Sequence, residues 1–265
     1  MTKKTIFLSM PSYDRKALIS SMTSIFQCAV TSKKSQMHYY AENGDSLVCR
    51  ARSNAFSNFI FDSSDDIFLS IDSDITIMNT FPQNNAFDKI VDGIESGKDI
   101  ICGLYACKDT TRRCSSFYEF EDNHKLEYSV ESKYEKLIWG ATGFMAISRR
   151  MALDFVDKYP NLIYVGDGHY VNRKRILAFN SLLVDIDIKN EKGEKVDSFK
   201  KLLSEDFAFS ELATQIGYQT WADTSIMLSH DGFTLFDINK SNEPKLPVYD
   251  PNIKISEVKV NLKTV

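Results

Sequence analysis

The segment from Ile67 to Asp74 constrains the fold more than any other part of this chain. A short apolar run, Ile67-Phe68-Leu69-Ser70-Ile71, leads directly into Asp72-Ser73-Asp74. A run of this length and composition predicts a buried strand. Because side chains two residues apart share one face of a strand, Asp72 and Asp74 can point the same way. Open α/β sheets bind ligands outside the carboxyl ends of their strands, so both carboxylates stand where a ligand is expected.

Two carboxylates this close repel each other unless a positive charge lies between them. A hard divalent cation that also contacts a diphosphate supplies that charge. An Asp-x-Asp triplet within a polar loop is most simply a solvated turn. Here the triplet Asp72-Ser73-Asp74 directly follows an apolar strand, and this context favours a cation site.

Strand-like and helix-like spacings of apolar residues alternate along the chain. We expect strands at 5–10, 67–71, 99–104, 182–188 and 220–228, with a further strand inside 137–147, and helices at 16–29, 53–60, 87–97, 149–159 and 202–216. In the first helix, Leu18, Ile19, Met22, Ile25, Phe26 and Ala29 predict one buried stripe. Gly97 and Gly217 follow two of these helices and predict their ends. This alternation predicts an α/β fold with a mostly parallel sheet covered by helices.

Composition limits the class of protein. The chain has 265 residues, of which 43% are hydrophobic, so it can bury a sizeable core. The net charge of −4 gives no overall attraction to nucleic acid or to an anionic membrane. Five cysteines without a Cys-x-x-Cys pair indicate free thiols in a reducing, cytoplasmic compartment. We find no run near the ~20 apolar residues that span a bilayer, and the basic run Arg173–Arg175 is most simply a solvated loop.

Seven short segments occur in an order that is typical of one enzyme family. They are Met10-Pro11-Ser12-Tyr13-Asp14-Arg15, Arg50-Ala51-Arg52-Ser53-Asn54, Ile71-Asp72-Ser73-Asp74, Ile101-Cys102-Gly103-Leu104-Tyr105, Gly140-Ala141-Thr142-Gly143-Phe144-Met145, Ser204-Glu205-Asp206-Phe207 and His230-Asp231-Gly232. Together they resemble the nucleotide-sugar-dependent glycosyltransferases of the GT-A fold, in particular the virus- and phage-type members. Ser53 stands where Asn is common in that family, and Ala106-Cys107-Lys108 replaces a frequent Pro-x-Lys.

The resemblance implies a Rossmann-like GT-A sheet with a smaller acceptor-side region. It further implies one domain over 1–265, divided into a nucleotide-binding half at 1–106, an acceptor-binding half at 107–236 and a C-terminal tail at 237–265. The expected activity is transfer of a sugar from a nucleoside diphosphate sugar, with uridine diphosphate favoured, to a hydroxyl acceptor on a glycan. The expected cofactor is Mn²⁺ or Mg²⁺.

The metal ligands implied by the resemblance are Asp72, Asp74 and His230. Asp74 is the first choice for direct ligation, while Asp72 orients the ribose or reaches the metal through water. Imidazole suits Mn²⁺ better than Mg²⁺. The alternative for His230 is a structural or solvent-exposed histidine.

Donor-binding residues are expected in four places. The first-strand exit supplies Pro11, Ser12, Tyr13 and Arg15, the helix start supplies Arg52, the metal motif supplies Ser73, and the floor of the sugar pocket supplies Gly140, Thr142 and Gly143. Guanidinium groups match phosphate oxygens, although both arginines are equally explained as surface ion pairs. The glycines allow close approach of a sugar or simply form a tight turn.

Asp206, with its neighbour Glu205, is the candidate catalytic group. Either Asp206 acts as a base or clamp for the acceptor hydroxyl, or the acidic pair complements the dipole of a helix that Ser204 caps.

Three other functions stay open at this point. A nucleotidyltransferase that makes activated sugars would need a Gly-rich phosphate loop, which Pro11-Ser12-Tyr13-Asp14 does not provide. A non-catalytic module that binds sugar nucleotides or glycans would keep the site without turnover. Glucosylation of modified bases in viral DNA would need a basic groove, which the sequence does not display.

Overall fold

The computed structural model describes residues 2–108, 114–116, 131–166, 170–189 and 195–231, so the predicted tail at 237–265 lies outside the described residues. The helices are α1 (Ile19–Thr31), α2 (Val48–Asp62), α3 (Ala86–Glu95), α4 (Arg149–Lys158), the 3-10 helix η1 (Pro160–Leu162) and α5 (Glu205–Gln215). The strands are β1 (Lys4–Ser12), β2 (Ser35–Asn43), β3 (Ile67–Ile71), β4 (Ile75–Ile77), β5 (Ile100–Leu104), β6 (Tyr134–Leu137), β7 (Phe144–Ser148), β8 (Ile163–Val165), β9 (Lys174–Ile176), β10 (Leu182–Lys189), β11 (Lys195–Leu203) and β12 (Thr220–His230).

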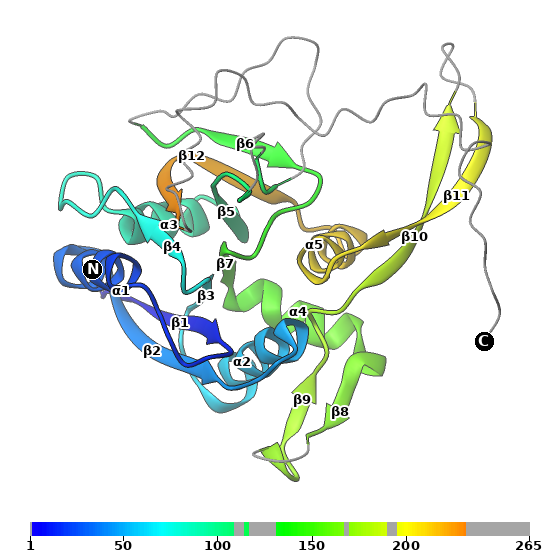
Figure 1. Cartoon of the computed structure of the whole chain (residues 1–265), viewed down its shortest axis with the longest axis horizontal. Helices are drawn as coiled ribbons and strands as arrows, with labels where there is room; N and C mark the ends of the chain where they lie inside the picture. The colour runs from blue at the N-terminus through cyan, green and yellow to red at the C-terminus, as the bar shows by residue number, and fades with distance from the viewer. Residues whose placement is uncertain (1, 109–113, 117–130, 167–169, 190–194, 232–265) are drawn as a thin grey trace.

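The described residues build one eight-stranded sheet in the order β2-β1-β3-β7-β5-β12-β4, with β6 paired to β12. β1 is parallel to β2 and β3, and β5 is parallel to β12. β7 lies antiparallel between β3 and β5, and β4 and β6 run antiparallel to β12. The predicted α/β class, with a mostly parallel sheet flanked by helices, is therefore confirmed (Figure 1). None of the described helices is long and apolar enough to cross a membrane.

Strand periodicity divides the core into two layers. In β1, Ile6 and Leu8 face the layer formed with α1 and α3, whereas Phe7 faces the layer formed with α2, α4 and α5. β3 repeats the pattern, with Leu69 in the first layer and Phe68 in the second. Both faces of the sheet are thus covered, which fixes its open functional side at the ends of the strands.

The buried stripe predicted for α1 is present only in part. Ile25 is fully buried, and Met22 and Ala29 pack against the same core cluster, whereas Ile19 is 85% exposed and Phe26 is 48% exposed. The side that α1 buries also carries Ser21 and Ser24.

The contact of Ser21 and Ser24 with β4 explains how α1 is oriented. β4 stands at the end of the sheet, where its outer backbone groups need other partners. The Ser21 hydroxyl donates to the carbonyl of Ile75 (2.6 Å), and the Ile77 N–H donates to the Ser24 hydroxyl (3.0 Å). Thr31 likewise donates to the carbonyl of Thr80 (2.6 Å). The hydroxyl groups of α1 therefore replace a neighbouring strand along β4.

Three further differences have local causes. β2 has no clear apolar alternation, and the sequence gives no prediction for it, because it is an edge strand. α5 begins at Glu205 and not at 202, since 202–203 complete β11. Arg175 is fully buried in β9, where its guanidinium lies 4.3 Å from the Tyr170 ring and bonds Asp62 (3.2 Å), so it does not belong to a solvated loop.

Two glycines end helices as predicted. Gly97 follows α3 with φ of 90°, and Gly217 follows α5 with φ of 92°. Only glycine adopts these left-handed conformations without strain, which explains why each helix stops there.

Replacing Ser24 with alanine tests the role of α1 along β4. The change leaves the buried N–H of Ile77 without its acceptor and removes the bond from Ser24 to the Ser21 carbonyl (2.8 Å). An unsatisfied buried donor costs about 1–3 kcal/mol. Urea unfolding should show a loss in this range for Ser24→Ala and a change below about 0.5 kcal/mol for Thr23→Ala, at an exposed position of the same helix. Equal losses for both variants would contradict the role.

Candidate active site at the carboxyl ends of the strands

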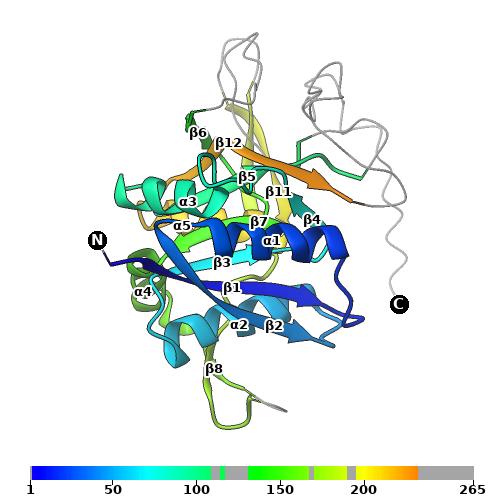
Figure 2. The ribbon, with the colours of Figure 1, turned by 90° about the vertical axis from the view of Figure 1, so that its left-hand side faces the viewer.

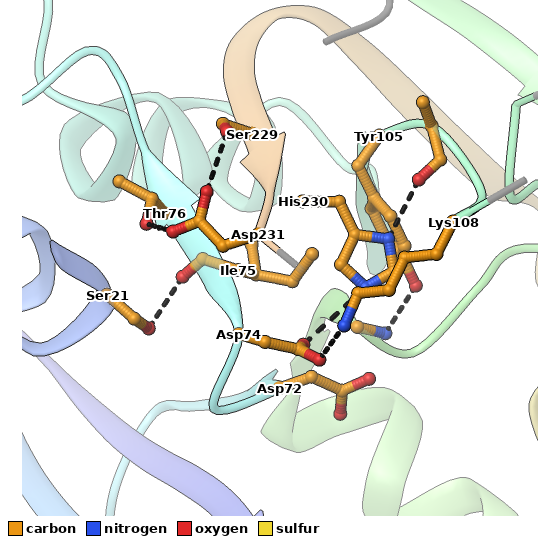
Figure 3. Close-up of polar contacts among 12 residues, drawn as sticks. Ser21, Asp72, Asp74, Ile75, Thr76, Tyr105, Lys108, Ser229, His230 and Asp231 are labelled. Carbon is orange, nitrogen blue, oxygen red and sulfur yellow. Dashed lines mark hydrogen bonds and ion pairs between the residues drawn. The ribbon is translucent and has the colours of Figure 1, made fainter. Parts of the chain in front are cut away.

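Four strands bring the predicted site together. β1 and β3 are neighbours and end at Ser12 and Ile71, and β5 and β12 are neighbours that lead into Tyr105 and end at His230. Segments that follow parallel strands meet at one edge of a sheet. Figure 3 shows Asp72, Asp74, Tyr105, Lys108 and His230 gathered at this edge.

Asp74 and His230 form the centre of the site. Nε2 of His230 lies 3.5 Å from Oδ1 of Asp74, and the Lys108 ammonium bonds Oδ2 of the same carboxylate. Burial alone would raise the pKa of Asp74, but bonds from His230 and Lys108 outweigh it and bring the pKa to about 2. The carboxylate is therefore ionised at neutral pH.

The backbone fixes the orientation of the His230 ring. Nδ1 lies 2.8 Å from the carbonyl oxygen of Ala106, which can only accept a hydrogen bond. Nδ1 therefore carries a proton, and Nε2 faces Asp74 (Figure 3). A doubly protonated ring donates from Nε2 to the carboxylate, whereas in the neutral ring the lone pair of Nε2 can bind a cation that lies between the two groups. A carbonyl partner on the far nitrogen is the usual support of a metal-binding histidine.

Asp74 and His230 have the right spacing for a divalent cation but are too few to complete its coordination. Two ligands that each lie ~2.1 Å from one ion stand roughly 3.0–3.5 Å apart, which matches the separation of Asp74 and His230. The described residues contain no group of three His, Cys, Asp or Glu side chains that could hold a metal. Asp74 and His230 could supply two positions to such a cation, and the rest would come from water or a phosphate ligand.

Asp72 points to a different partner. Its Oδ1 accepts from Nη2 of Arg52 (2.6 Å), and Nη1 of Arg52 bonds Oε1 of Glu205 (2.5 Å). The Arg52 side chain is only 7% exposed. Burial alone would lower the pKa of Arg52, but Asp72 and Glu205 outweigh burial and raise it. Arg52 thus joins the Asp72 turn to the start of α5, and both sides of its fork are taken by carboxylates.

Tyr105 lies in the middle of these groups. Its hydroxyl accepts the N–H of Gly143 (3.0 Å), and its ring meets the His230 ring edge-on at 5.2 Å. Burial raises the pKa of Tyr105, and the nearby charges of Asp72 and Asp206 raise it further. Tyr105 is therefore neutral, and its contacts hold it beside His230 and the Gly143 backbone.

The predicted sugar-pocket glycines are accounted for by packing. A Cβ at Gly143 would come within 2.2 Å of the Tyr105 hydroxyl, and one at Gly140 within 2.4 Å of Sγ of Cys102. Thr142, between them, is buried, and no described residue bonds its hydroxyl. Thr142 is therefore the member of this segment with an unused polar atom.

The predicted donor residues after β1 occupy the neighbouring strand end. Ser12 donates to the carbonyl of Lys16 (2.7 Å), while Tyr13 is 69% exposed. Pro11 is half-buried within β1, and Arg15 is exposed with a φ of 60°. The Ser73 carbonyl accepts the N–H of Leu18 (3.0 Å), which ties the metal motif to the start of α1.

Glu205 and Asp206, the acidic pair at the start of α5, bond different partners. Glu205 is 18% exposed and is held by Arg52. Asp206 accepts the N–H of Phe207 (2.8 Å) and the hydroxyl of Ser204 through Oδ1, and no described residue donates to its Oδ2. Ser204 occupies the predicted N-cap position, but its side chain bonds Asp206 in place of the helix backbone.

Sequence reasoning missed Lys108, Tyr105 as a site residue, and Asp231. The Asp231 carboxylate accepts hydroxyls of Ser20 (2.8 Å) and Thr76 (2.8 Å), and its N–H donates to the Asp74 carbonyl (2.8 Å). It therefore joins α1, β4 and β12 behind the site (Figure 3). Lys108 and Tyr105 could have been predicted from their positions just after β5, because ligands bind at the carboxyl ends of the strands. Gly232, which was predicted beside Asp231, lies outside the described residues.

Neither the protein-family models nor the curated protein sequences yield a match to this chain. Among solved structures, the chain is similar to A197 from STIV, with 16% identity, a TM-score of 0.50, and coverage of 88% of this chain and 93% of that chain. The structure of CMP:2-keto-3-deoxy-manno-octonic acid synthetase complexed with CTP gives a TM-score of 0.32 at 9% identity over 63% of this chain and 80% of that chain. Apo UDP-glucose pyrophosphorylase gives 0.34 at 8% identity over 72% and 56%. The first similarity shows a shared overall fold, and the two lower scores carry no inference.

Proposed function

We propose that this protein is a metal-dependent glycosyltransferase that transfers a sugar from a nucleoside diphosphate sugar to a hydroxyl acceptor. The observation that carries the proposal is the Asp74–His230 pair, whose donor atoms lie 3.5 Å apart at the carboxyl ends of β3 and β12. Uridine diphosphate is the preferred nucleotide and a glycan the preferred acceptor. The donor would occupy the half at 1–106 and the acceptor the half at 107–236.

The charges at this edge suit a diphosphate. A divalent cation held by Asp74 and His230 would stabilise the negative charge that develops on the leaving diphosphate. Lys108 places a further positive group beside it, and ammonium groups bind phosphate. Arg52 neutralises Asp72 and Glu205 and is not free to bind the donor. The Asp72–Arg52 bond holds the strand-end turn in one conformation, which preorganises the site.

We assign the acceptor hydroxyl to Asp206, because no described residue donates to its Oδ2 and because its charge acts on Tyr105 in the site. In the transfer step, the acceptor oxygen would bond the anomeric carbon as the bond from that carbon to the diphosphate breaks. The hydroxyl proton would pass to the carboxylate of Asp206, and the bonding electrons would leave with the phosphate oxygen. Glu205 is unsuited to this role because its carboxylate bonds Arg52.

Donor binding should require a divalent cation. Calorimetry with a uridine diphosphate sugar should show binding in Mn²⁺ and none after chelation, because without a cation the Asp74 carboxylate repels the two phosphates. His230→Ala should raise the Mn²⁺ concentration needed by about 10–100-fold. His38→Ala is the matched control, since His38 is 63% exposed and bonds Asp65 far from this edge. Unchanged affinity after chelation would contradict the proposal.

The released product distinguishes this function from nucleotidyl transfer. Slow metal-dependent hydrolysis of the donor should release a nucleoside diphosphate. Release of pyrophosphate from a nucleoside triphosphate and a sugar phosphate would instead identify a nucleotidyltransferase, and binding without any turnover would identify a non-catalytic module.

Asp206→Asn should slow transfer while donor affinity and melting temperature stay nearly unchanged. A general base contributes about 10²–10⁴-fold to rate, and its effect falls on the transition state. Asp185→Asn, at an exposed position of β10, serves as the control. If the Asp206 variant keeps near-normal transfer and loses less than ~1 kcal/mol of stability, Asp206 only complements the α5 dipole.

A further inference from the structure

One face of the molecule combines an apolar helix surface with an open strand edge. We call it the α1–β2 face and define it by the outer side of α1 together with Tyr39 of β2. Ile19 is 85% exposed, Val30 84%, Phe26 48% and Tyr39 43%. α1 and β2 lie on the side that Figure 2 turns toward the viewer and that forms the left-hand side of Figure 1.

The helix contribution is unusual in its charge. α1 has 13 residues, Ile19–Thr31, and none of them is Asp, Glu, Lys, Arg or His. A surface helix ordinarily turns charged residues to solvent. α1 instead directs the Ser21 and Ser24 hydroxyls to β4 and exposes Ile19, Phe26 and Val30. The other exposed residues of the helix, such as Thr23 and Gln27, are uncharged. Large apolar side chains exposed on one uncharged helix surface are typical of an interaction site.

The strand contribution is an unpaired edge. β2 is the last strand of the sheet order, and only β1 pairs with it within the described residues. Its nine residues, Ser35–Asn43, include no Lys, Arg or Pro, which are the residues that usually block strand pairing at an exposed edge. β2 can therefore accept a further strand.

We propose that a second copy of this chain covers the α1–β2 face through antiparallel pairing of the two β2 strands about a two-fold axis. Full pairing of nine residues places Tyr39 opposite Tyr39 of the partner subunit. Glu42, the one acidic residue of β2, then falls opposite Gln36 of the partner subunit, so the register sets no like charges against each other. Such a two-fold contact is isologous and closes on itself.

The charge balance favours a second copy over a membrane. Two uncharged α1 surfaces bring no like charges together. The net charge of −4 would repel an anionic bilayer. The inference is independent of the proposed transferase activity.

Sedimentation velocity over a concentration series tests the assembly. Wild type should approach twice the chain mass of 30.2 kDa. The double variant Ile19→Glu/Val30→Glu should dissociate at least about tenfold more readily, because it buries like charges. Leu183→Glu, at a 61% exposed position of β10, should leave the assembly unchanged. Circular dichroism should show that each variant stays folded.

A cysteine placed on the two-fold axis tests the geometry. Residues opposite each other in an antiparallel pair have Cα atoms about 4.5–5.5 Å apart, within the range for a disulfide. Tyr39→Cys should form a disulfide-linked dimer under mild oxidation. Val196→Cys, at a 58% exposed position of β11, and wild type should not. A monomeric wild type, equal linking at positions 39 and 196, or vesicle binding lost in the glutamate variant would each overturn the proposal.

Discussion

The candidate site depends on how the backbone of the turn Asp72-Ser73-Asp74 is held. The Asp72 N–H donates to the carbonyl of Gly143 (3.0 Å), and the Ser73 carbonyl accepts from Leu18 (3.0 Å). The Asp74 carbonyl accepts from Asp231 (2.8 Å). Segments before β7, before α1 and after β12 therefore each supply one bond. Because these partners are far apart in the chain, the turn reaches its conformation only when the whole sheet is assembled.

This constraint explains features that otherwise look unrelated. α1 must turn its serines inward because β4 continues from the turn and needs partners along its outer edge. Asp231 reinforces the same region by bonding Ser20 of α1 and Thr76 of β4. With Ser21 and Ser24 turned toward β4, Ile19, Phe26 and Val30 stay on the outer side of α1. The functional edge and the α1–β2 face are thus two consequences of one packing requirement.

The turn also concentrates negative charge, which the basic side chains of Arg52 and Lys108 balance. Arg52 is buried against Asp72, and removing one partner of such a pair is costly because the other charge is left uncompensated. Lys108 meets Asp74 at a more exposed position, where an ion pair contributes little to stability. Arg52 is therefore mainly architectural, whereas Lys108 can exchange Asp74 for a ligand at small cost.

The sequence was sufficient for features set by local pattern. The strand before Asp72, the helix stops at Gly97 and Gly217, and the α/β class follow from short-range spacing and backbone preferences. Features set by distant partners were not predictable. The Arg52–Glu205 bond joins residues 153 positions apart, and the apolar spacing of α1 gives no sign that its serines face β4. The Ala106 carbonyl that orients His230 could not be predicted from the pattern of side chains, because every residue carries the same backbone carbonyl.

The central claim is that His230 offers Nε2 to a cation shared with Asp74 while Nδ1 bonds the Ala106 carbonyl. Nitrogen-15 NMR of the histidine rings, at a pH where imidazole is neutral, tests it directly. The account predicts a protonated Nδ1 at His230 and a large shift of the Nε2 resonance alone when a diamagnetic cation such as Zn²⁺ is added together with uridine diphosphate. A protonated Nε2, or a His230 spectrum that does not respond to the cation, would contradict it.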